Sequence, residues 1–164
     1  MSLMSMVQRL VGEDLRVVVV GGLAASLHGS AILTNDLDVC YDPEEQNLRR
    51  LSAILTEWGA YPRGWPPGLP FYMDARTFRT TPTFTLTTRE GDIDLLHRVE
   101  PIGDYAACAA AAVPVPAFGV VVPTLRLGAV IRAKRFANRP KDLAALPELE
   151  AVAVKRGEWP PTAE

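Results

Sequence analysis

Two pairs of aspartates are the residues best suited to chemistry. Asp36 and Asp38 are separated by one apolar residue, and so are Asp92 and Asp94. Because successive side chains of a β-strand point to opposite faces, each pair places two carboxylates on one face. Carboxylates are ligands that divalent cations such as Mg²⁺ prefer. The two pairs therefore predict a cation site if the fold brings the strands together; the alternative is two strands with solvent-facing acids.

A strand, a glycine pair and a short helix precede the first acid pair. The apolar run 17–20 has the composition of a strand buried on both faces, and Gly21 and Gly22 follow it directly. A helical pattern over residues 23–27 ends near Gly29. Such an arrangement suits phosphate binding. Neither the dinucleotide fingerprint Gly-x-Gly-x-x-Gly nor a P-loop Gly-Lys-Ser/Thr is present, which argues against both of those classes.

These residues resemble a known family. The segments GGLAASLHG and TNDLDV are similar to the signature of the DNA polymerase β-like nucleotidyltransferase superfamily, and closest to small relatives of the abortive-infection nucleotidyltransferase toxins. The resemblance covers roughly residues 17–42, 83–96 and 124–146. It implies an α/β domain of the α+β type, with a mixed central sheet flanked by helices and a helical C-terminal part.

The resemblance also implies roles for individual residues. It assigns the paired acids and a third acid on a neighbouring strand to Mg²⁺ or Mn²⁺ binding and to catalysis, which here are Asp36, Asp38 and Asp94. Asp92 is the lesser candidate for the third position. The nucleoside triphosphate is expected to contact four further residues: Gly21, Gly22, Ser30 and Lys134. One departure stands out, because Ile32 occupies a position where that branch often has a basic residue, and this predicts weak triphosphate binding.

Lys134 is also unusual by its position in the pattern. It continues the apolar stripe of a helix expected over residues 125–137, where Leu127, Val130 and Ile131 face inward. An inward-facing ammonium needs an anionic partner such as a phosphate or a carboxylate. The downstream Arg139 and Asp142 belong to the same family-like segment, in which Asp142 is expected to pair with a nearby cation.

Further elements follow from caps, breakers and periodicity. A leading helix is expected over residues 4–14, and Asp42 is the predicted N-cap of a helix ending at Gly59. The apolar stripe of that helix is assigned to the core: Leu48, Leu51, Leu55 and Trp58. Thr124 is the predicted cap of the helix over 125–137, and Pro140 starts a final helix.

The remaining segments include one long irregular region. Residues 83–96 predict a hairpin, 105–112 a short helix, and 113–122 an edge-like or irregular strand, because Pro114 and Pro116 cannot donate to a ladder. Residues 60–82 predict a long loop, whose aromatic side chains either stack on a base or acceptor or only pack the loop down: Trp65, Phe71 and Tyr72.

Whole-chain properties bound the class of protein. The 164 residues predict a single domain over 1–164, with a core at about 15–122 and C-terminal helices at about 124–154. A net charge of −2 gives no global basic field to attract nucleic acid. Cys40 and Cys108 show no zinc or disulfide pattern, so free thiols and a cytoplasmic location are expected. No apolar run approaches the ~20 residues of a membrane span, so no membrane partner is expected.

The expected reaction is nucleotidyl transfer. An acceptor oxygen would attack the α-phosphate of a nucleoside triphosphate and expel pyrophosphate, with RNA, a protein or a small molecule as the acceptor. The resemblance implies a toxin–antitoxin or resistance context for such an enzyme, with a cognate partner protein. ATP is one of the nucleoside triphosphates that it could bind. The alternative is a catalytically degenerate nucleotide-binding or antitoxin-like partner protein, which the Ile32 departure favours.

Overall fold

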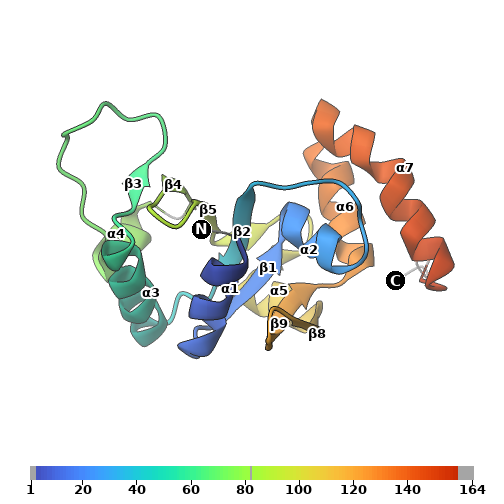
Figure 1. The fold of residues 1–164 in the computed structure, drawn as a ribbon, viewed down its shortest axis with the longest axis horizontal. Helices are drawn as coiled ribbons and strands as arrows, with labels where there is room; N and C mark the ends of the chain where they lie inside the picture. The colour runs from blue at the N-terminus through green and yellow to red at the C-terminus, as the bar shows by residue number, and fades with distance from the viewer. Residues whose placement is uncertain (1–2, 82, 159–164) are drawn as a thin grey trace.

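A mixed β-sheet occupies the centre of the protein (Figure 1). The computed structural model describes residues 3–81 and 83–158, and within these residues the main sheet has seven strands in the order β3-β4-β5-β2-β1-β9-β8. Their bounds are as follows: β1 Val17–Val20, β2 Asp36–Tyr41, β3 Tyr61–Pro62, β4 Thr83–Thr87, β5 Asp92–Leu96, β8 Ala112–Ala117 and β9 Val120–Leu125. A separate two-stranded ladder joins β6 (Arg98–Val99) to β7 (Gly103–Asp104).

Two neighbouring strand pairs are parallel, and the others are antiparallel. Strand β2 pairs parallel to β5, and β1 pairs parallel to β9. Strand β1 is buried along its whole length, since none of the four valines over 17–20 exposes more than 2% of its surface. This confirms the predicted strand covered on both faces, and it places β1 and β2 at the centre of the core.

Helices cover the sheet and extend beyond it on one side (Figure 1). Their bounds are as follows: α1 Leu3–Gly12, α2 Gly21–Leu27, α3 Glu45–Glu57, α4 Ala75–Thr80, α5 Tyr105–Ala110, α6 Leu127–Ala137 and α7 Pro140–Lys155. The predicted core stripe of α3 is confirmed, because Leu48, Leu51, Leu55 and Trp58 are all at most 4% exposed. The mixed sheet with flanking helices and a helical C-terminal part is the predicted fold class.

Two predicted helix caps are wrong. Helix α3 begins at Glu45 with Glu44 as its N-cap, whose carboxylate accepts from the backbone N–H groups of Gln46 and Asn47 at 3.2 and 3.3 Å. Asp42 lies two residues before this N-cap, and Arg16 on the neighbouring chain segment binds its carboxylate at 2.8 Å.

The second correction concerns Thr124. This residue lies inside β9, fully buried opposite Val19 of β1, and its hydroxyl donates to the carbonyl of Val122 at 2.9 Å. Helix α6 therefore starts three residues later, with Arg126 at the N-cap position. Pairing with β1 places Thr124 inside the sheet, although a threonine side chain suits a helix N-cap equally well.

The long region over residues 60–82 is partly ordered into elements that the sequence did not indicate. Strand β3 adds two residues to the edge of the sheet beside β4, and α4 begins after Asp74, which caps it. Residues 63–74 form the loop between them. Residues 112–125 form a hairpin, in which β8 is the predicted edge strand while β9 is an interior strand.

Figure 1 shows the loop over 63–74 and the pair of helices α6 and α7 on opposite sides of the upper end of β2. The side chains of the candidate site come from these two sides and from the strands between them. Within residues 3–81 and 83–158, no helix has the length and apolar character that crossing a membrane requires.

Candidate active site

The two acid pairs meet on adjacent parallel strands. Asp36 lies opposite Asp92 and Asp38 lies opposite Asp94 in the register of β2 and β5. The residues between them, Leu37 and Ile93, are fully buried on the other face of the sheet. The alternation predicted from the sequence is therefore present, and it sets four half-buried carboxylates in two rows at one end of the central strands.

Asp38 and Asp94 interact most closely. Burial of Asp38, together with the charge of Asp94 and a hydrogen bond to it, raises the pKa of Asp38 to about 7. The charge of Asp36 adds to this shift, and Lys141 opposes it. Two carboxylates held together in a partly dry site disfavour each other's ionised form, and a cation between them removes this penalty.

The backbone of Gly21 forms the floor under Asp38. Gly21 adopts a φ of +63°, and a Cβ built on it would lie 2.1 Å from Oδ2 of Asp38. Only glycine provides both the backbone conformation and the space. The first glycine of the pair is therefore required by the position of the Asp38 carboxylate.

Gly22 and Ser30 do not line the cleft that opens beside the acids. Both residues are expected to contact the nucleotide. A Cβ on Gly22 would lie 2.8 Å from Oγ1 of Thr34, so this glycine makes room for the chain that leads into β2. The hydroxyl of Ser30 donates to Glu148 on α7 at 3.0 Å. The nucleotide-binding roles of Gly22 and Ser30 stay predictions.

A cleft of about 340 Å³ opens beside the acids. Its polar lining includes three aspartates from the sheet, Asp36, Asp38 and Asp94, and cations that come from β6 and the C-terminal helices: Arg98, Lys134, Arg139 and Lys141. The apolar lining comes from the strands and from one face of α6: Val20, Leu96, Val99, Leu125, Val130, Ala133, Phe136 and Ala137. The cleft is thus lined by acids of β2 and β5 and by the cations Lys134, Arg139 and Lys141 of the α6–α7 segment, here called the basic wall; Glu100 and Asp142 add two further carboxylates to the lining.

Lys134 and Arg139 are held on the basic wall by a buried carboxylate. Asp142 is 1% exposed; it accepts two hydrogen bonds from the guanidinium of Arg139, at 2.7 and 3.2 Å, and lies 3.7 Å from Nζ of Lys134. Burial acts to raise the pKa of Asp142, but the hydrogen bond from Arg139 and the two positive charges outweigh it and lower that pKa. The predicted inward placement of Lys134 and its pairing with an acid are confirmed; its contact with phosphate stays a prediction.

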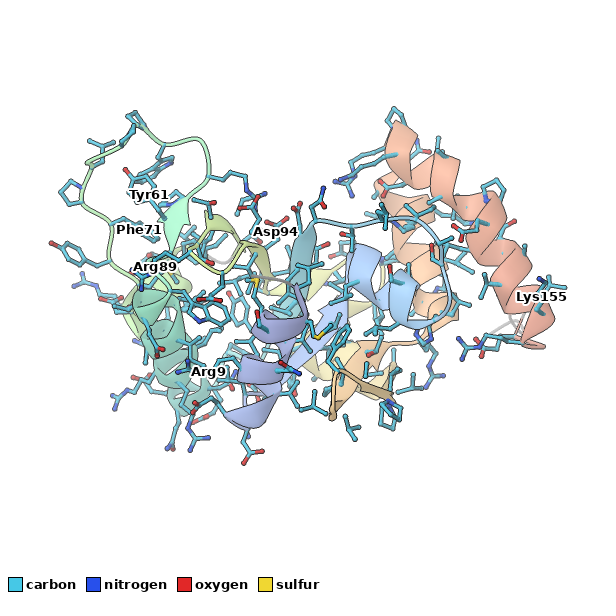
Figure 2. All side chains as sticks on the ribbon, viewed as in Figure 1. Arg9, Tyr61, Phe71, Arg89, Asp94 and Lys155 are labelled. Carbon is cyan, nitrogen blue, oxygen red and sulfur yellow. The ribbon has the colours of Figure 1, made fainter. Side chains whose placement is uncertain are left out.

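Arg63 contacts the acids although no sequence pattern singles it out. Its Nη2 donates to Oδ1 of Asp94 at 3.0 Å, and its Nε lies 3.4 Å from Oδ2 of Asp92. Figure 2 shows Asp94 near the middle of the molecule, with Tyr61 of β3 and Phe71 of the loop over 63–74 to its left. The contact joins residues 31 positions apart, and no local pattern marks such a pair.

The donor set fits a divalent cation at Asp38 and Asp94. Mg²⁺ commonly uses one or two protein carboxylates and takes its other ligands from water and phosphate. A larger protein cage is not formed: among residues 3–81 and 83–158, no three His, Cys, Asp or Glu side chains lie close enough together to hold a metal ion. Asp36 lines the cleft two residues before Asp38 on the same strand, and its place in a three-acid set stays a prediction.

Comparison with solved structures gives the fold. A crystal structure of a Thermotoga maritima protein, provisionally assigned as a nucleotidyltransferase, superposes with a TM-score of 0.57 over 89% of this chain and 88% of that chain, at 18% sequence identity. The chain has a nucleotidyltransferase-like fold. Neither the protein-family models nor the curated proteins include a match to the sequence.

In this nucleotidyltransferase-like fold, the acids of β2 and β5 and the cations of α6 and α7 line one cleft. The structural likeness extends over most of both chains. At 18% identity the likeness concerns the fold alone. Function therefore has to be argued from the cleft itself.

Proposed function

We propose that the chain is a metal-dependent nucleotidyltransferase, which transfers a nucleoside monophosphate from a nucleoside triphosphate to an acceptor. The observation that carries this proposal is the pairing of Asp38 with Asp94 in register on adjacent parallel strands, facing cations across one cleft. A carboxylate pair that favours a cation, opposite a basic wall that favours phosphate, suits a reaction between a metal-bound triphosphate and a nucleophile.

In this proposal Asp36, Asp38 and Asp94 hold Mg²⁺ or Mn²⁺ and form the catalytic residues. The metal supplies charge stabilisation for the phosphates during transfer and for the leaving pyrophosphate. Asp94 also accepts the proton of the acceptor hydroxyl. The backbone of Gly21 shapes the floor of the site, because its missing Cβ lets the Asp38 carboxylate lie against the chain.

The basic wall holds the triphosphate. Lys134 has a side chain only 18% exposed, and its pairing with buried Asp142 directs the ammonium along the cleft instead of into solvent. Arg139 and Lys141 add positive charge on the same wall. Because Asp142 fixes both Lys134 and Arg139, these cations are pre-organised before the nucleotide arrives, which reduces the entropy lost on binding.

The acceptor enters from the side of the loop over 63–74, opposite the basic wall. The ring of Trp65 packs edge-on against Tyr61 and Phe71, as the alternative of a packed loop predicts, whereas Tyr72 is 79% exposed and open to a base, a peptide or a small molecule. An RNA end, a protein side chain and an antibiotic-like compound all present a suitable hydroxyl. The proposal also includes a toxin–antitoxin or resistance context and a cognate partner protein.

A second candidate is a catalytically degenerate nucleotide-binding or antitoxin-like partner protein. The contact of Arg63 with Asp94 favours it, because a positive charge already neutralises one of the three proposed metal ligands. Ile32 favours it as well, since it is 46% exposed and brings no cation to the segment before β2. This candidate predicts nucleotide binding without transfer.

The test measures metal-dependent transfer of a labelled nucleotide, with each of the four common ribonucleoside triphosphates and with RNA, protein and small-molecule acceptors. The wild type is expected to transfer label with Mg²⁺ or Mn²⁺, and Asp38→Asn is expected to lose the transfer. The substitution keeps the size of the side chain and removes the charge that a divalent ion needs. Because Asp38 is buried beside like charges, loss of its charge leaves the fold intact.

Asp14→Asn is the matched control. It removes the same charge at an exposed position with φ 56°, a conformation that asparagine adopts readily, and it lies outside the cleft. Its transfer rate should equal that of the wild type. Thermal shifts with each nucleotide, with and without metal, are recorded in parallel. Binding without transfer to any acceptor class supports the degenerate partner protein, whereas transfer that survives in Asp38→Asn refutes the assignment of the site.

A further inference from the structure

The side chain of Arg63 crosses one strand to reach the acids. Arg63 follows β3 at the edge of the sheet, and its backbone N–H donates to the carbonyl of Thr85 on β4 at 2.9 Å. Its guanidinium continues past β4 and contacts Asp94 of β5 at 3.0 Å. The position of its backbone is therefore fixed by the sheet, and only the side chain can change its partners.

The sequence of β4 leaves a path for this side chain. Thr85 and Thr87 lie opposite Asp94 and Asp92, and they share the acid face of the sheet because Phe84 and Leu86 are buried on the other face. Threonines at these two positions are small enough for an arginine to lie across them. A larger side chain there would separate Arg63 from β5.

Asp92 lies beside the guanidinium as an ion-pair partner, although buried Nε of Arg63 makes no hydrogen bond to it. Thr87 donates to Oδ1 of Asp92 at 2.7 Å, which leaves Oδ2 facing Nε of Arg63 at 3.4 Å. The carbonyl of Leu86 accepts from Nη2 of Arg63 at 3.0 Å. Two partners of Arg63 thus lie outside the pair formed by Asp38 and Asp94, and they remain available when the contact with Asp94 is absent.

We propose that Arg63 is a positioning residue that acts as a built-in counter-ion of Asp94, and that a divalent cation must displace it to bind between Asp38 and Asp94. This inference rests on the proposed function, because it takes these two carboxylates as the metal site. Asp92 is assigned to hold Arg63 and is thereby removed from the set of metal ligands. The exchange swaps one cation for another at Asp94 and leaves the backbone in place.

The exchange has a direct consequence for affinity. While Arg63 holds Oδ1 of Asp94, the pair offers a metal ion one free carboxylate and one neutralised carboxylate. A charge-assisted hydrogen bond that has to be broken weakens the apparent binding of the metal. Arg63 therefore keeps the site selective for a cation that arrives with additional ligands, such as one already bound to a triphosphate.

The test measures Mn²⁺ binding to the nucleotide-free protein, from the electron paramagnetic resonance signal of the free ion. Arg63→Gln should bind Mn²⁺ about tenfold more tightly than the wild type, since one charge-assisted hydrogen bond no longer competes. Damage to the site would lower the affinity, so a gain is a result that a merely structural role does not produce.

Arg89→Gln is the matched control for the loss of a positive charge. Arg89 lies in the turn between β4 and β5, where it donates to the backbone carbonyl of Glu57 and not to either acid pair. Its Mn²⁺ affinity should stay within about twofold of the wild type, because an exposed charge outside the site is screened. Equal gains in Arg63→Gln and Arg89→Gln overturn the inference, as does unchanged or weaker binding in Arg63→Gln.

A second measurement uses the wild type and does not depend on the folding of a variant. The ¹⁵N side-chain resonances of Arg63, assigned from the spectrum of Arg63→Lys, should shift as Mg²⁺ is added. Resonances that stay unchanged while Mg²⁺ binds overturn the inference. Failure of the wild type and every variant to bind Mn²⁺ refutes the metal-dependent function itself and the inference with it, whereas normal binding without an Arg63 effect refutes the inference alone.

Discussion

Gly21→Ala tests whether the first glycine of α2 is required by the Asp38 carboxylate. The wild-type backbone at Gly21 has a φ of +63°, and the added Cβ would lie 2.1 Å from Oδ2 and 3.0 Å from Cγ of Asp38. Both the backbone conformation and the contact therefore oppose the substitution. The atoms in conflict belong to a proposed metal ligand, so the same change that strains the chain also moves the site.

The magnitude follows from two separate costs. A residue with a Cβ in the left-handed region costs about 1–2 kcal/mol. Moving Asp38 away from its preferred rotamer costs about 0.5–1.5 kcal/mol. Together they predict a loss of about 1.5–3.5 kcal/mol in the free energy of unfolding, which lowers Tm by roughly 3–14 °C for a domain of this size.

Urea unfolding in the absence of metal separates the two costs when it is repeated in an Asp38→Ala background. That background removes Oδ2 and Cγ and leaves only the Cβ of residue 38, at 3.1 Å, so Gly21→Ala should there cost little more than the backbone share of about 1–2 kcal/mol. Gly128→Ala is the control, because a Cβ at Gly128 in α6 meets no atom within 4 Å. It should be neutral or stabilising. Equal losses in both backgrounds would refute the argument that Gly21 makes room for Asp38.

Two further predictions concern stability. Asn47→Ala should lower the free energy of unfolding by about 2–4 kcal/mol in urea titrations. The side chain of Asn47 is 4% exposed and makes hydrogen bonds with both backbone groups of Arg16 and with the carbonyl of Asp42, at 2.8, 3.0 and 2.8 Å. Arg49→Ala on the exposed side of the same helix should change the free energy of unfolding by less than about 0.5 kcal/mol, and equal effects would contradict the prediction. His28 should make the free energy of unfolding fall as the pH drops below about 6.5. Burial lowers the pKa of His28 in the folded protein, so the unfolded chain binds the proton more readily. The urea midpoint of the wild type should therefore fall more between pH 7.5 and 5 than that of His28→Gln, and parallel pH profiles would contradict the prediction.

The acid face of the sheet could be predicted because strand alternation is a local property. Asp38 and Asp94 each stand between apolar neighbours, and those neighbours fill the core on the opposite face. The same reasoning applies to the run 17–20, whose four valines predict burial on both faces. In these cases the neighbouring residues in the sequence determine which face of the strand is buried.

The contacts of Arg63 and Ser30 could not be predicted, because each depends on a distant segment. Arg63 meets Asp94 across β4, and Ser30 meets Glu148, 118 positions along the chain. The misassigned Thr124 has the same origin: its side chain suits a cap, but pairing with β1 places it in the sheet. Where two local outcomes have similar energies, tertiary packing selects one.

The direction of β5 relative to β2 decides what the acids can do. Alternation places each acid pair on a face of its strand, but not at an end of the sheet. Because β2 and β5 run parallel, Asp38 and Asp94 share one level and lie at the same end. Antiparallel pairing would reverse the order of the two acids along one strand, which sets Asp38 against Asp92. The concentration of negative charge at this end then requires cations, and they come from Arg63 on one side and from Lys134 on the other. The topology thus creates both the carboxylate pair and the need for the positive groups that surround it.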